Sequence, residues 1–455
     1  MNDSAGTPGR TAGHRTAGHR TAVRRTAFVN ARLLDPASGL DAPGALVVED
    51  GRIADLGPGL LAEGVSEGMA RIDCGGHCLA PGLIDMRVQL REPGEEHKET
   101  IASAGVAAAE GGVTSVAALP NTEPVVDDVS GVEFVARRAR EAKLVKVYTY
   151  AAATRRLEGR EITEIGLLAE FGAVGFTDGL HAVADALVMR RVLDYARAFD
   201  QLIVQHPEEP SLAAGVMNEG EVATRLGLAG IPAAAEAIMV ERDLRLVELT
   251  GARYHAAHIS TAAAVEAIRG AKARGLAVTC DTAPHYFTLN EHAVGDYRSF
   301  AKVSPPLRAE ADRAAIAAAV AEGTIDAVAS DHSPHDQESK RLPFAHAAPG
   351  IAGLETLLAL TLALYHKGEL GLLDVLDRMT VRPAGILGLE AGRLAKGAPA
   401  DLVLFDLERP WRIDPDAFRS KSKNSPFENH PVQGKVLRTV VDGRTVFEAV
   451  FEAGA

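Results

Sequence analysis

Short apolar runs alternate with segments of helical periodicity through the middle of the chain. The predicted strands are 83–90, 113–119, 145–151, 173–177, 202–206, 253–258, 277–282 and 326–330. Helical segments lie between them, for example 100–110, 131–142, 235–250 and 261–274. Eight strands that are each followed by a helix predict an α/β fold, a (β/α)8 barrel of the TIM type.

Both ends of the chain are rich in short strands. Strands are predicted at 28–34, 45–49 and 52–56, and again at 400–406 and 436–442. Asp50-Gly51 predicts a two-residue hairpin turn, and Asp442-Gly443 repeats that pattern near the other end. We therefore expect one small β domain built from residues 27–80 and 393–455, with the barrel at 81–392.

The first residues repeat a short basic unit, Arg-Thr-Ala-Gly-His, between positions 10 and 27. Small and basic residues leave nothing to bury, so we expect a disordered tail over 1–26. An arm that binds nucleic acid or phosphate is the alternative. A transit peptide is disfavoured because the segment lacks an amphipathic apolar face.

Composition excludes several classes of protein. The chain has 455 residues, with 48 Lys and Arg against 61 Asp and Glu, and its net charge of −13 argues against a nucleic-acid binder. Three cysteines give no disulfide framework and suit a reducing cytosol. No apolar run approaches the ~18 residues of a membrane span. These features predict a soluble, cytoplasmic protein.

The first barrel strand carries an unusual polar face. Arg87, Gln89 and Arg91 point to one side of the strand, while the apolar residues between them point to the other. Buried polar side chains are costly unless they meet partners. An edge strand with a solvated face is one interpretation. We favour a strand whose polar face looks into a functional site.

The stretch 81–94, Pro-Gly-Leu-Ile-Asp-Met-Arg-Val-Gln-Leu-Arg-Glu-Pro-Gly, resembles the first barrel strand of the dihydroorotases, which are metal-dependent amidohydrolases. In that family the positions of Arg87 and Gln89 are histidines, and this His-x-His pair binds a catalytic metal. Here they are degenerate metal positions. The resemblance runs from about residue 28 to residue 447, and it implies a barrel beside a composite β-sandwich.

Later motifs imply the remaining metal ligands. Gly175-Phe-Thr-Asp178-Gly resembles the family segment whose aspartate bridges two metals, although an ordinary Asp-Gly turn is the alternative. His206 and His258 match the histidines at the ends of strands five and six. Asp331, in Ala329-Ser-Asp-His-Ser-Pro-His335, matches the aspartate that is both metal ligand and catalytic proton shuttle. His255 lies on the other side of its strand and is expected in the core.

Three residues match the substrate side of the family site. Arg91 and Asn121 match the clamp for the substrate carboxylate, and His335 matches a histidine that contacts substrate. A planar guanidinium binds a carboxylate as a fork. Ser304 stands where the family has an asparagine that holds the substrate ring. His285, in a Pro-His pair, is expected in the wall of the site.

The substitutions limit the metal chemistry. A divalent metal lowers the pKa of bound water from ~16 to about 7. Arg87 has no lone pair to offer a metal, and Gln89 is a poor ligand beside imidazole. Asp178, His206 and His258 could still hold one Zn²⁺, so we expect one zinc per chain at most. We also expect Arg87 to pair with Asp178 and Asp331 and to replace the missing charge.

The resemblance implies a hydrolase of cyclic amides: reversible hydrolysis of dihydroorotate to N-carbamoyl-L-aspartate in pyrimidine synthesis. One alternative is a catalytically silent subunit, a pseudoenzyme that scaffolds aspartate transcarbamoylase. A third hypothesis is a hydrolase of another cyclic amide, such as allantoin or a hydantoin. Arg91 and Asn121 speak against it, because their match implies an anionic substrate. We also expect a homo-oligomer.

Overall fold

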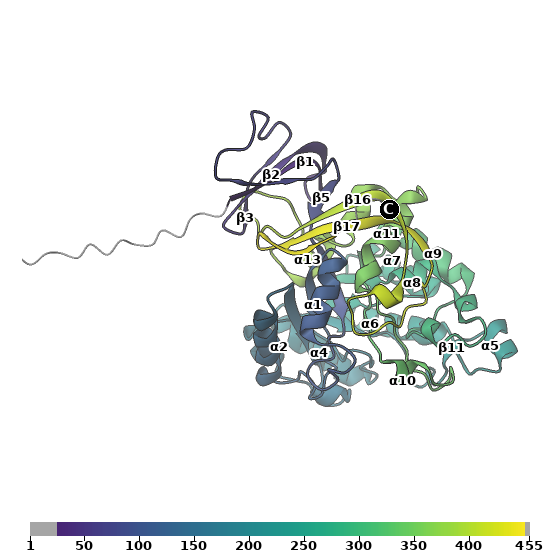
Figure 1. Ribbon diagram of the computed structural model, residues 1–455. Helices are drawn as coiled ribbons and strands as arrows, with labels where there is room; N and C mark the ends of the chain where they lie inside the picture. The colour runs from purple at the N-terminus through teal and green to yellow at the C-terminus, as the bar shows by residue number, and fades with distance from the viewer. Residues whose placement is uncertain (1–24, 451–455) are drawn as a thin grey trace, which may run out of the picture.

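The computed structural model describes residues 25–450, and its centre is a parallel barrel (Figure 1). Within those residues the barrel sheet has eight strands in the order β15-β14-β13-β10-β9-β8-β7-β6. A parallel bridge between Val88 and His332 joins the first strand to the segment after the last. The strands are β6 Leu83–Val88, β7 Val113–Ala118, β8 Lys146–Ala151, β9 Ala173–Phe176, β10 Leu202–Gln205, β13 Arg253–Ala256, β14 Val278–Thr282 and β15 Ala327–Val328. The predicted barrel is confirmed.

Helices surround this sheet. The longer ones are α1 Ile101–Glu110, α2 Val129–Ala142, α4 Ala186–Ala198, α6 Ala234–Thr250, α7 Ala262–Ala273, α9 Glu310–Glu322 and α11 Leu357–His366. Shorter ones are α3 Ile165–Glu170, α5 Glu221–Leu226, α8 Pro284–Thr288, α10 Gln337–Lys340, α12 Leu372–Asp377 and α13 Val381–Leu387. Side-chain caps set several starts: Thr100 accepts the Ser103 N–H at α1, and Asp128 accepts the Gly131 N–H at α2. No helix within residues 25–450 is long and apolar enough to cross a membrane.

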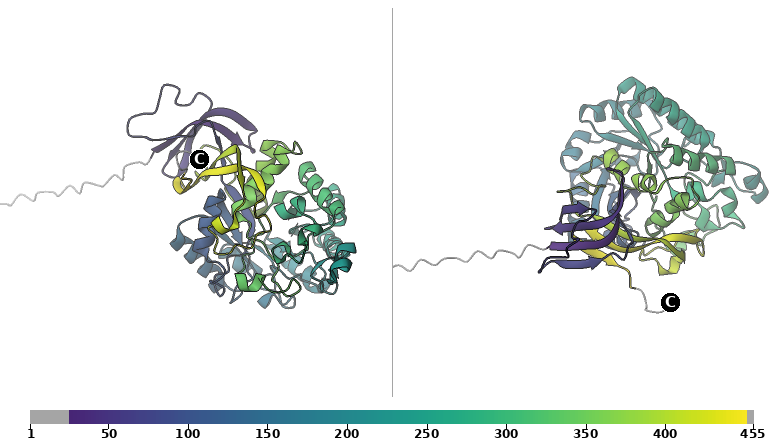
Figure 2. Two further views of the ribbon diagram at one scale, coloured as in Figure 1. Left: turned by 45° about the vertical axis from the view of Figure 1, so that its right-hand side comes forward. Right: turned by 90° about the horizontal axis from the view of Figure 1, so that it is seen from above.

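A second sheet is drawn from both ends of the chain, as predicted. Its strands are β1 Arg25–Asp35, β2 Leu40–Glu49, β3 Arg52–Gly57, β4 Ala70–Asp73, β5 Cys78–Pro81, β16 Leu402–Arg412, β17 Pro431–Val441 and β18 Arg444–Glu448. The early strands and the late strands lie together on one side of the barrel (Figure 2). β17 packs on α11, and the Thr439 hydroxyl donates to the Ala109 carbonyl of α1. These contacts attach the second sheet to the barrel.

The two predicted hairpin turns are both present and lie against one another. Asp50 and Gly51 have φ of 48° and 82°, and Asp442 and Gly443 have φ of 47° and 72°. Positive φ at both central residues is the conformation that a two-residue hairpin turn needs. A Cβ on Gly51 would lie 3.0 Å from the Asp442 carbonyl oxygen, so the approach of the turns requires glycine there.

The basic repeat at the start lies mostly outside the described residues. Its last residues, from Arg25, already belong to β1, where Arg25 pairs with Glu49 of β2. The strand therefore begins earlier than the pattern of apolar residues indicates, because antiparallel pairing to β2 orders positions whose side chains are polar.

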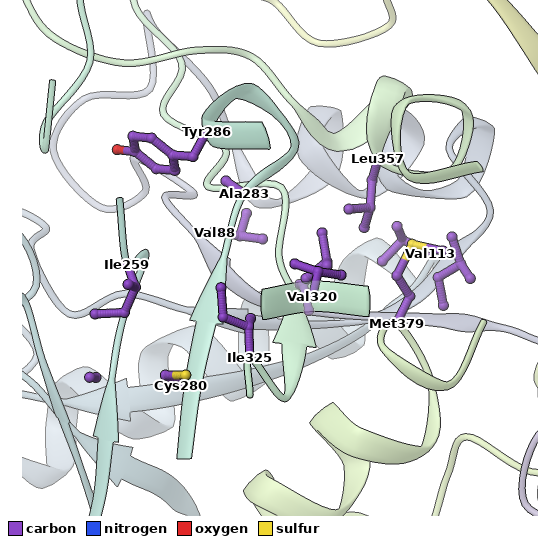
Figure 3. Packing of buried hydrophobic residues seen from close by; sticks show 14 of the residues in the cluster. Val88, Val113, Ile259, Cys280, Ala283, Tyr286, Val320, Ile325, Leu357 and Met379 are labelled. Carbon is purple, nitrogen blue, oxygen red and sulfur yellow. The ribbon is translucent and has the colours of Figure 1, made fainter. Parts of the chain in front are cut away.

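The strand with the polar face is buried on both sides. Every residue of β6 is buried, and Arg87 is 1 % exposed and Gln89 2 % exposed. Val88 packs in the apolar layer between strands and helices, which Figure 3 shows with Val320 and Leu357. The edge-strand interpretation is therefore wrong, and the polar side of β6 faces other protein groups.

Candidate functional site

The candidate residues gather where the barrel strands end. Arg87 lies near the end of β6, and Asp178, His206, His258 and Asp331 follow β9, β10, β13 and β15. Carboxyl ends of parallel strands meet at one face of a barrel, which is where such folds carry chemistry. All five side chains are buried. Contacts with other protein groups therefore decide their charge and orientation.

Asp331 is the centre of the cluster. Arg87 Nε donates to Asp331 Oδ1 at 2.9 Å, and His258 Nδ1 lies 3.1 Å from Oδ2. His206 Nδ1 lies 2.7 Å from His258 Nε2, and His285 Nε2 lies 3.9 Å from Asp331 Oδ2. Four strand ends thus contribute to one continuous polar chain, which starts at His206, passes through His258 and Asp331, and ends at Arg87.

The hydrogen bonds determine which atoms carry protons. Burial, followed by the charge of Arg87, lowers the pKa of His258 to about 4, so this imidazole is neutral near pH 7. Its Nδ1 must donate to the Asp331 carboxylate, and its Nε2 therefore accepts from His206 Nδ1. With His258 neutral, Arg87 supplies the formal positive charge opposite Asp331.

The carboxyl of Asp331 stays ionised although it is buried. Burial alone would raise the pKa of Asp331, but the hydrogen bond from His258 and the Arg87 guanidinium hold the pKa well below its usual value. The ion pair of Asp331 with Arg87 is enclosed, since Arg87 is 1 % exposed.

Neighbouring groups hold His258 and Asp331 in strained backbone positions. Their φ values are 38° and 52°, which costs about 1–3 kcal/mol each in a residue other than glycine. The Asp281 carboxylate accepts the His258 N–H at 2.6 Å, and Glu236 accepts the Ser260 N–H at 3.0 Å. Ser330, next to Asp331, donates its N–H to Asp85 Oδ1 at 3.1 Å, so carboxylates behind the site hold the backbone at both positions.

His255 belongs to this supporting layer, in agreement with its expected place in the core. Its Nε2 lies 2.9 Å from Asp281 Oδ2 and its Nδ1 lies 2.8 Å from the Thr279 hydroxyl. Both ring nitrogens have protein partners, and the side chain is fully buried. It stabilises Asp281, which in turn holds the backbone of His258.

Asp178 is held by a residue that the sequence motifs did not indicate. Thr154 donates its backbone N–H to Asp178 Oδ1 at 2.8 Å, and its hydroxyl donates to Oδ2. Burial raises the pKa of Asp178 to about 6, and these hydrogen bonds oppose the rise. Arg87 Nη2 donates to the Gly179 carbonyl at 3.2 Å rather than to Asp178. The expected Arg87–Asp331 pair is present, and the expected Arg87–Asp178 pair is replaced because Thr154 already satisfies that carboxylate.

The donor set fits a two-metal centre poorly. Within residues 25–450, no three His, Cys, Asp or Glu side chains are placed to share one metal ion. Arg87 takes the Asp331 oxygen that a first metal would need. His206 and His258 still turn ring nitrogens toward one another, which is a donor pair suited to a single divalent ion.

Gln89 connects Asn121, one of the predicted substrate-binding residues, to the loop after β15. Asn121 Nδ2 donates to Gln89 Oε1 at 3.0 Å, and Gln89 Nε2 donates to the Ser333 hydroxyl at 2.7 Å. The Gln89 amide accepts through its oxygen and donates through its nitrogen, so both of these bonds come from one planar group. Gln89 therefore joins Asn121 to the loop that carries His335.

Arg91 and His335 also lie together. Arg91 Nη2 lies 3.2 Å from His335 Nε2, Arg91 Nε donates to the Pro334 carbonyl, and Arg91 Nη1 pairs with Glu95 at 2.9 Å. Two of the three predicted substrate-binding residues are thus in contact, and the third reaches the same loop through Gln89. Glu95 competes for the guanidinium, so an incoming carboxylate has to displace a protein partner.

A pocket of about 750 Å³ opens beside the histidines and is lined by His206, Glu208 and Ser304. Ser304 donates to Glu208 Oε2 at 3.2 Å, and the same carboxylate oxygen lies 3.5 Å from His206 Nε2. Glu208 and Thr154 are site residues for which the motifs gave no role. Each lies three residues past the end of its strand, and that position was the available signal.

Known proteins resemble this chain closely. A family model described as "Dihydro-orotase-like" matches residues 76–264. A dihydroorotase of Anaplasma phagocytophilum (strain HZ) is 47 % identical, covering 93 % of this chain and 95 % of the relative. A dihydroorotase of Syntrophus aciditrophicus (strain SB) is 46 % identical, covering 92 % of this chain and 98 % of the relative.

Solved structures of cyclic amide hydrolases share the fold of this chain. The L-hydantoinase (dihydropyrimidinase) of Arthrobacter aurescens superposes with a TM-score of 0.84 at 27 % identity, covering 93 % of this chain and 96 % of that one. A dihydropyrimidinase of Brevibacillus agri NCHU1002 shares the fold with a TM-score of 0.81 at 22 % identity, over 93 % and 95 % of the two chains. Dihydroorotases and hydantoinases are metal-dependent families. With relatives matched over nearly its whole length, the chain belongs to the dihydroorotase family of cyclic amide hydrolases within the amidohydrolase superfamily.

Proposed function

We propose that this protein catalyses the reversible hydrolysis of dihydroorotate to N-carbamoyl-L-aspartate, a step of pyrimidine synthesis. The observation that carries the proposal is the buried chain His206–His258–Asp331 at the carboxyl ends of three barrel strands. It lies in a chain that matches dihydroorotases over more than nine-tenths of its length. In this proposal the cyclic amide and the attacking water meet beside this carboxylate and its two imidazoles.

In this proposal Asp331 moves the proton. Its carboxylate takes a proton from the attacking water and returns it to the ring nitrogen as the carbon–nitrogen bond breaks. His258 orients that carboxylate through Nδ1. Asp331 is buried, and so charge that develops beside it is screened less than in water.

Arg91, Asn121 and His335 bind the carboxylate of dihydroorotate. Arg91 is 6 % exposed, so a substrate carboxylate that replaced Glu95 would be largely dry. Charge-assisted bonds to a planar guanidinium are roughly twice as strong as neutral ones. This contact selects an anionic ring over a neutral hydantoin.

We further propose that any metal is limited to one zinc ion per chain, held by His206 and His258. Asp178 would serve as a third ligand only after turning away from Thr154, which now donates to both of its oxygens. A bound zinc would supply a water of lowered pKa. The His-x-His position does not fit a metal, because Arg87 carries a permanent charge there. No step above depends on a metal at that position.

The test measures turnover in both directions on purified protein, with dihydroorotate, N-carbamoyl-L-aspartate and hydantoin as substrates. We expect turnover of dihydroorotate and of N-carbamoyl-L-aspartate and little turnover of hydantoin. The Asp331→Asn variant should lose turnover of all three. Turnover of hydantoin at a comparable kcat/KM would replace the proposed substrate by a neutral cyclic amide.

A second candidate function is a silent subunit that scaffolds aspartate transcarbamoylase. One observation bears on its catalytic silence, though not on the partner: the guanidinium of Arg87 donates to Asp331, the proposed proton carrier. Gel filtration of a mixture with that enzyme separates the two functions. Co-elution together with absent turnover would favour the scaffold.

A further inference from the structure

Arg87 has a hydrogen-bonding group that the protein leaves unused. Its Nε donates to Asp331 at 2.9 Å and its Nη2 donates to the Gly179 carbonyl at 3.2 Å. Arg87 Nη1 is shielded from solvent and has no partner within the described residues. A guanidinium carries five N–H donors, and a buried donor without a partner destabilises the protein.

A second unpartnered nitrogen lies beside the same carboxylate. His285 Nε2 lacks a hydrogen-bond partner among the described residues, and the side chain is 2 % exposed. It lies 3.9 Å from Asp331 Oδ2, too far for a hydrogen bond, while Arg87 holds Oδ1. Two buried polar groups with unmet bonding capacity thus flank one catalytic carboxylate. Buried unsatisfied groups call for an explanation, and a catalytic role is one of those that such groups have in proteins.

We propose that Arg87 binds the reacting carbonyl oxygen of the substrate through Nη1 and carries the negative charge that develops on it. This inference rests on the proposed function and goes beyond it, since Arg87 becomes a catalytic residue rather than the remnant of a metal site. The cation is preorganised, because Asp331 and Gly179 hold the other two nitrogens of the guanidinium.

The chemical step balances without any further reactant. The water oxygen bonds to the carbonyl carbon, the electron pair of the C=O bond moves onto the oxygen at Arg87, and Asp331 takes the water proton. The pair then returns to re-form C=O, the carbon–nitrogen bond breaks, and the nitrogen receives the proton from Asp331. The products are a carboxylic acid and the ureido nitrogen of the opened ring. Arg87 gains and loses no proton in the cycle and keeps its charge.

The experiment uses chemical rescue. Arg87→Ala leaves a space for a free guanidinium ion, and urea is a neutral control of the same shape. We expect kcat to fall about 10²- to 10³-fold with KM changed far less, as for loss of a donor to a developing oxyanion. Millimolar guanidinium is expected to restore kcat at least about tenfold, and urea is expected to restore none.

A matched control is Arg378→Ala, a buried arginine whose Nε donates to the Val320 carbonyl, away from the site. We expect that added guanidinium does not change the kcat of the Arg378→Ala variant. If Arg87→Ala does not fold, Arg87→Met keeps much of the side-chain volume and must show the same loss of kcat. An Arg87 variant with wild-type kcat, or rescue by urea as well as guanidinium, would overturn the inference. A wild-type protein that neither binds nor turns over dihydroorotate would instead refute the proposed function.

Discussion

Arg87 and Asp331 form a buried ion pair in which Nε lies 2.9 Å from Oδ1. The pair joins the first barrel strand to the segment after the last, at the point where the bridge between Val88 and His332 closes the barrel. In the dihydroorotases that this chain resembles, the residues at both positions bind a metal. Here a side-chain cation neutralises the carboxylate, which lets the barrel keep an ionised Asp331 without a first metal.

Restoring the imidazole pair should create a metal position. In the double variant Arg87→His/Gln89→His, Asp331 loses its guanidinium and two ring nitrogens become available beside it. We expect the zinc content to rise by one ion per chain, as measured by plasma mass spectrometry after dialysis. Gln89→His alone keeps Arg87 and serves as the control, with no added zinc. An unchanged content in the double variant would mean that Arg87 does not block a metal.

His255 and His258 are both fully buried, but their substitution should have different effects, on stability for His255 and on activity for His258. His255→Ala removes the partner of Asp281, so we expect a loss of about 2–4 kcal/mol in the free energy of unfolding. In His258→Ala we expect turnover to fall at least about 10²-fold, since Asp331 loses its orienting donor. Urea denaturation and initial rates measure the two effects. Equal activity losses in the folded variants would contradict the assignment of His255 to the core.

Arg91 should control selection of the anionic substrate. For Arg91→Ala we expect kcat/KM for dihydroorotate to fall about 10- to 100-fold, the worth of charged hydrogen bonds to a carboxylate. Residual turnover of neutral hydantoin, if any, should change little. Initial rates with both substrates test this. A variant with unchanged kcat/KM for dihydroorotate would remove Arg91 from the binding site.

Lys340 should make stability depend on pH. It is fully buried, its Nζ donates to the Ala348 carbonyl at 2.8 Å, and burial lowers its pKa to about 7 from an ordinary value of 10.5. The unfolded chain therefore binds this proton more tightly between pH 7 and 10.5. In that window Lys340 makes stability rise with pH, by at most about 1.4 kcal/mol per unit.

The corresponding measurement is urea denaturation of wild type and Lys340→Met at several pH values. The difference in unfolding free energy between the two proteins should change between pH 7 and pH 10 in favour of wild type. A difference that stays constant across this range would show that Lys340 keeps an ordinary pKa in the folded protein.

The sequence predicted the barrel because strand and helix periods are local properties. All eight strands occur within a few residues of their expected bounds, from β6 Leu83–Val88 to β15 Ala327–Val328. The turn pairs at Asp50 and Asp442 were predictable for the same reason, since Asp-Gly fixes a backbone conformation.

The partners inside the site were harder to predict, because they join residues far apart in the chain. The pairing of Arg87 with Asp331 was foreseen from charge, but its reach to the Gly179 carbonyl depends on backbone geometry. Thr154 caps Asp178 from the neighbouring strand, and a lone threonine after a strand carries no distinctive signal. Contacts of this kind follow from the way the strand ends meet in space.

The most direct test is the metal content of the untagged protein, with dihydroorotate turnover assayed on the same sample and on its His206→Ala variant. We expect turnover with no more than one zinc ion per chain, and loss of both turnover and any zinc in the variant. Two zinc ions per chain, or zinc at the Arg87 position, would contradict the assignment of Arg87 as the cation of the site. Absence of turnover at any metal content would contradict the proposed enzyme.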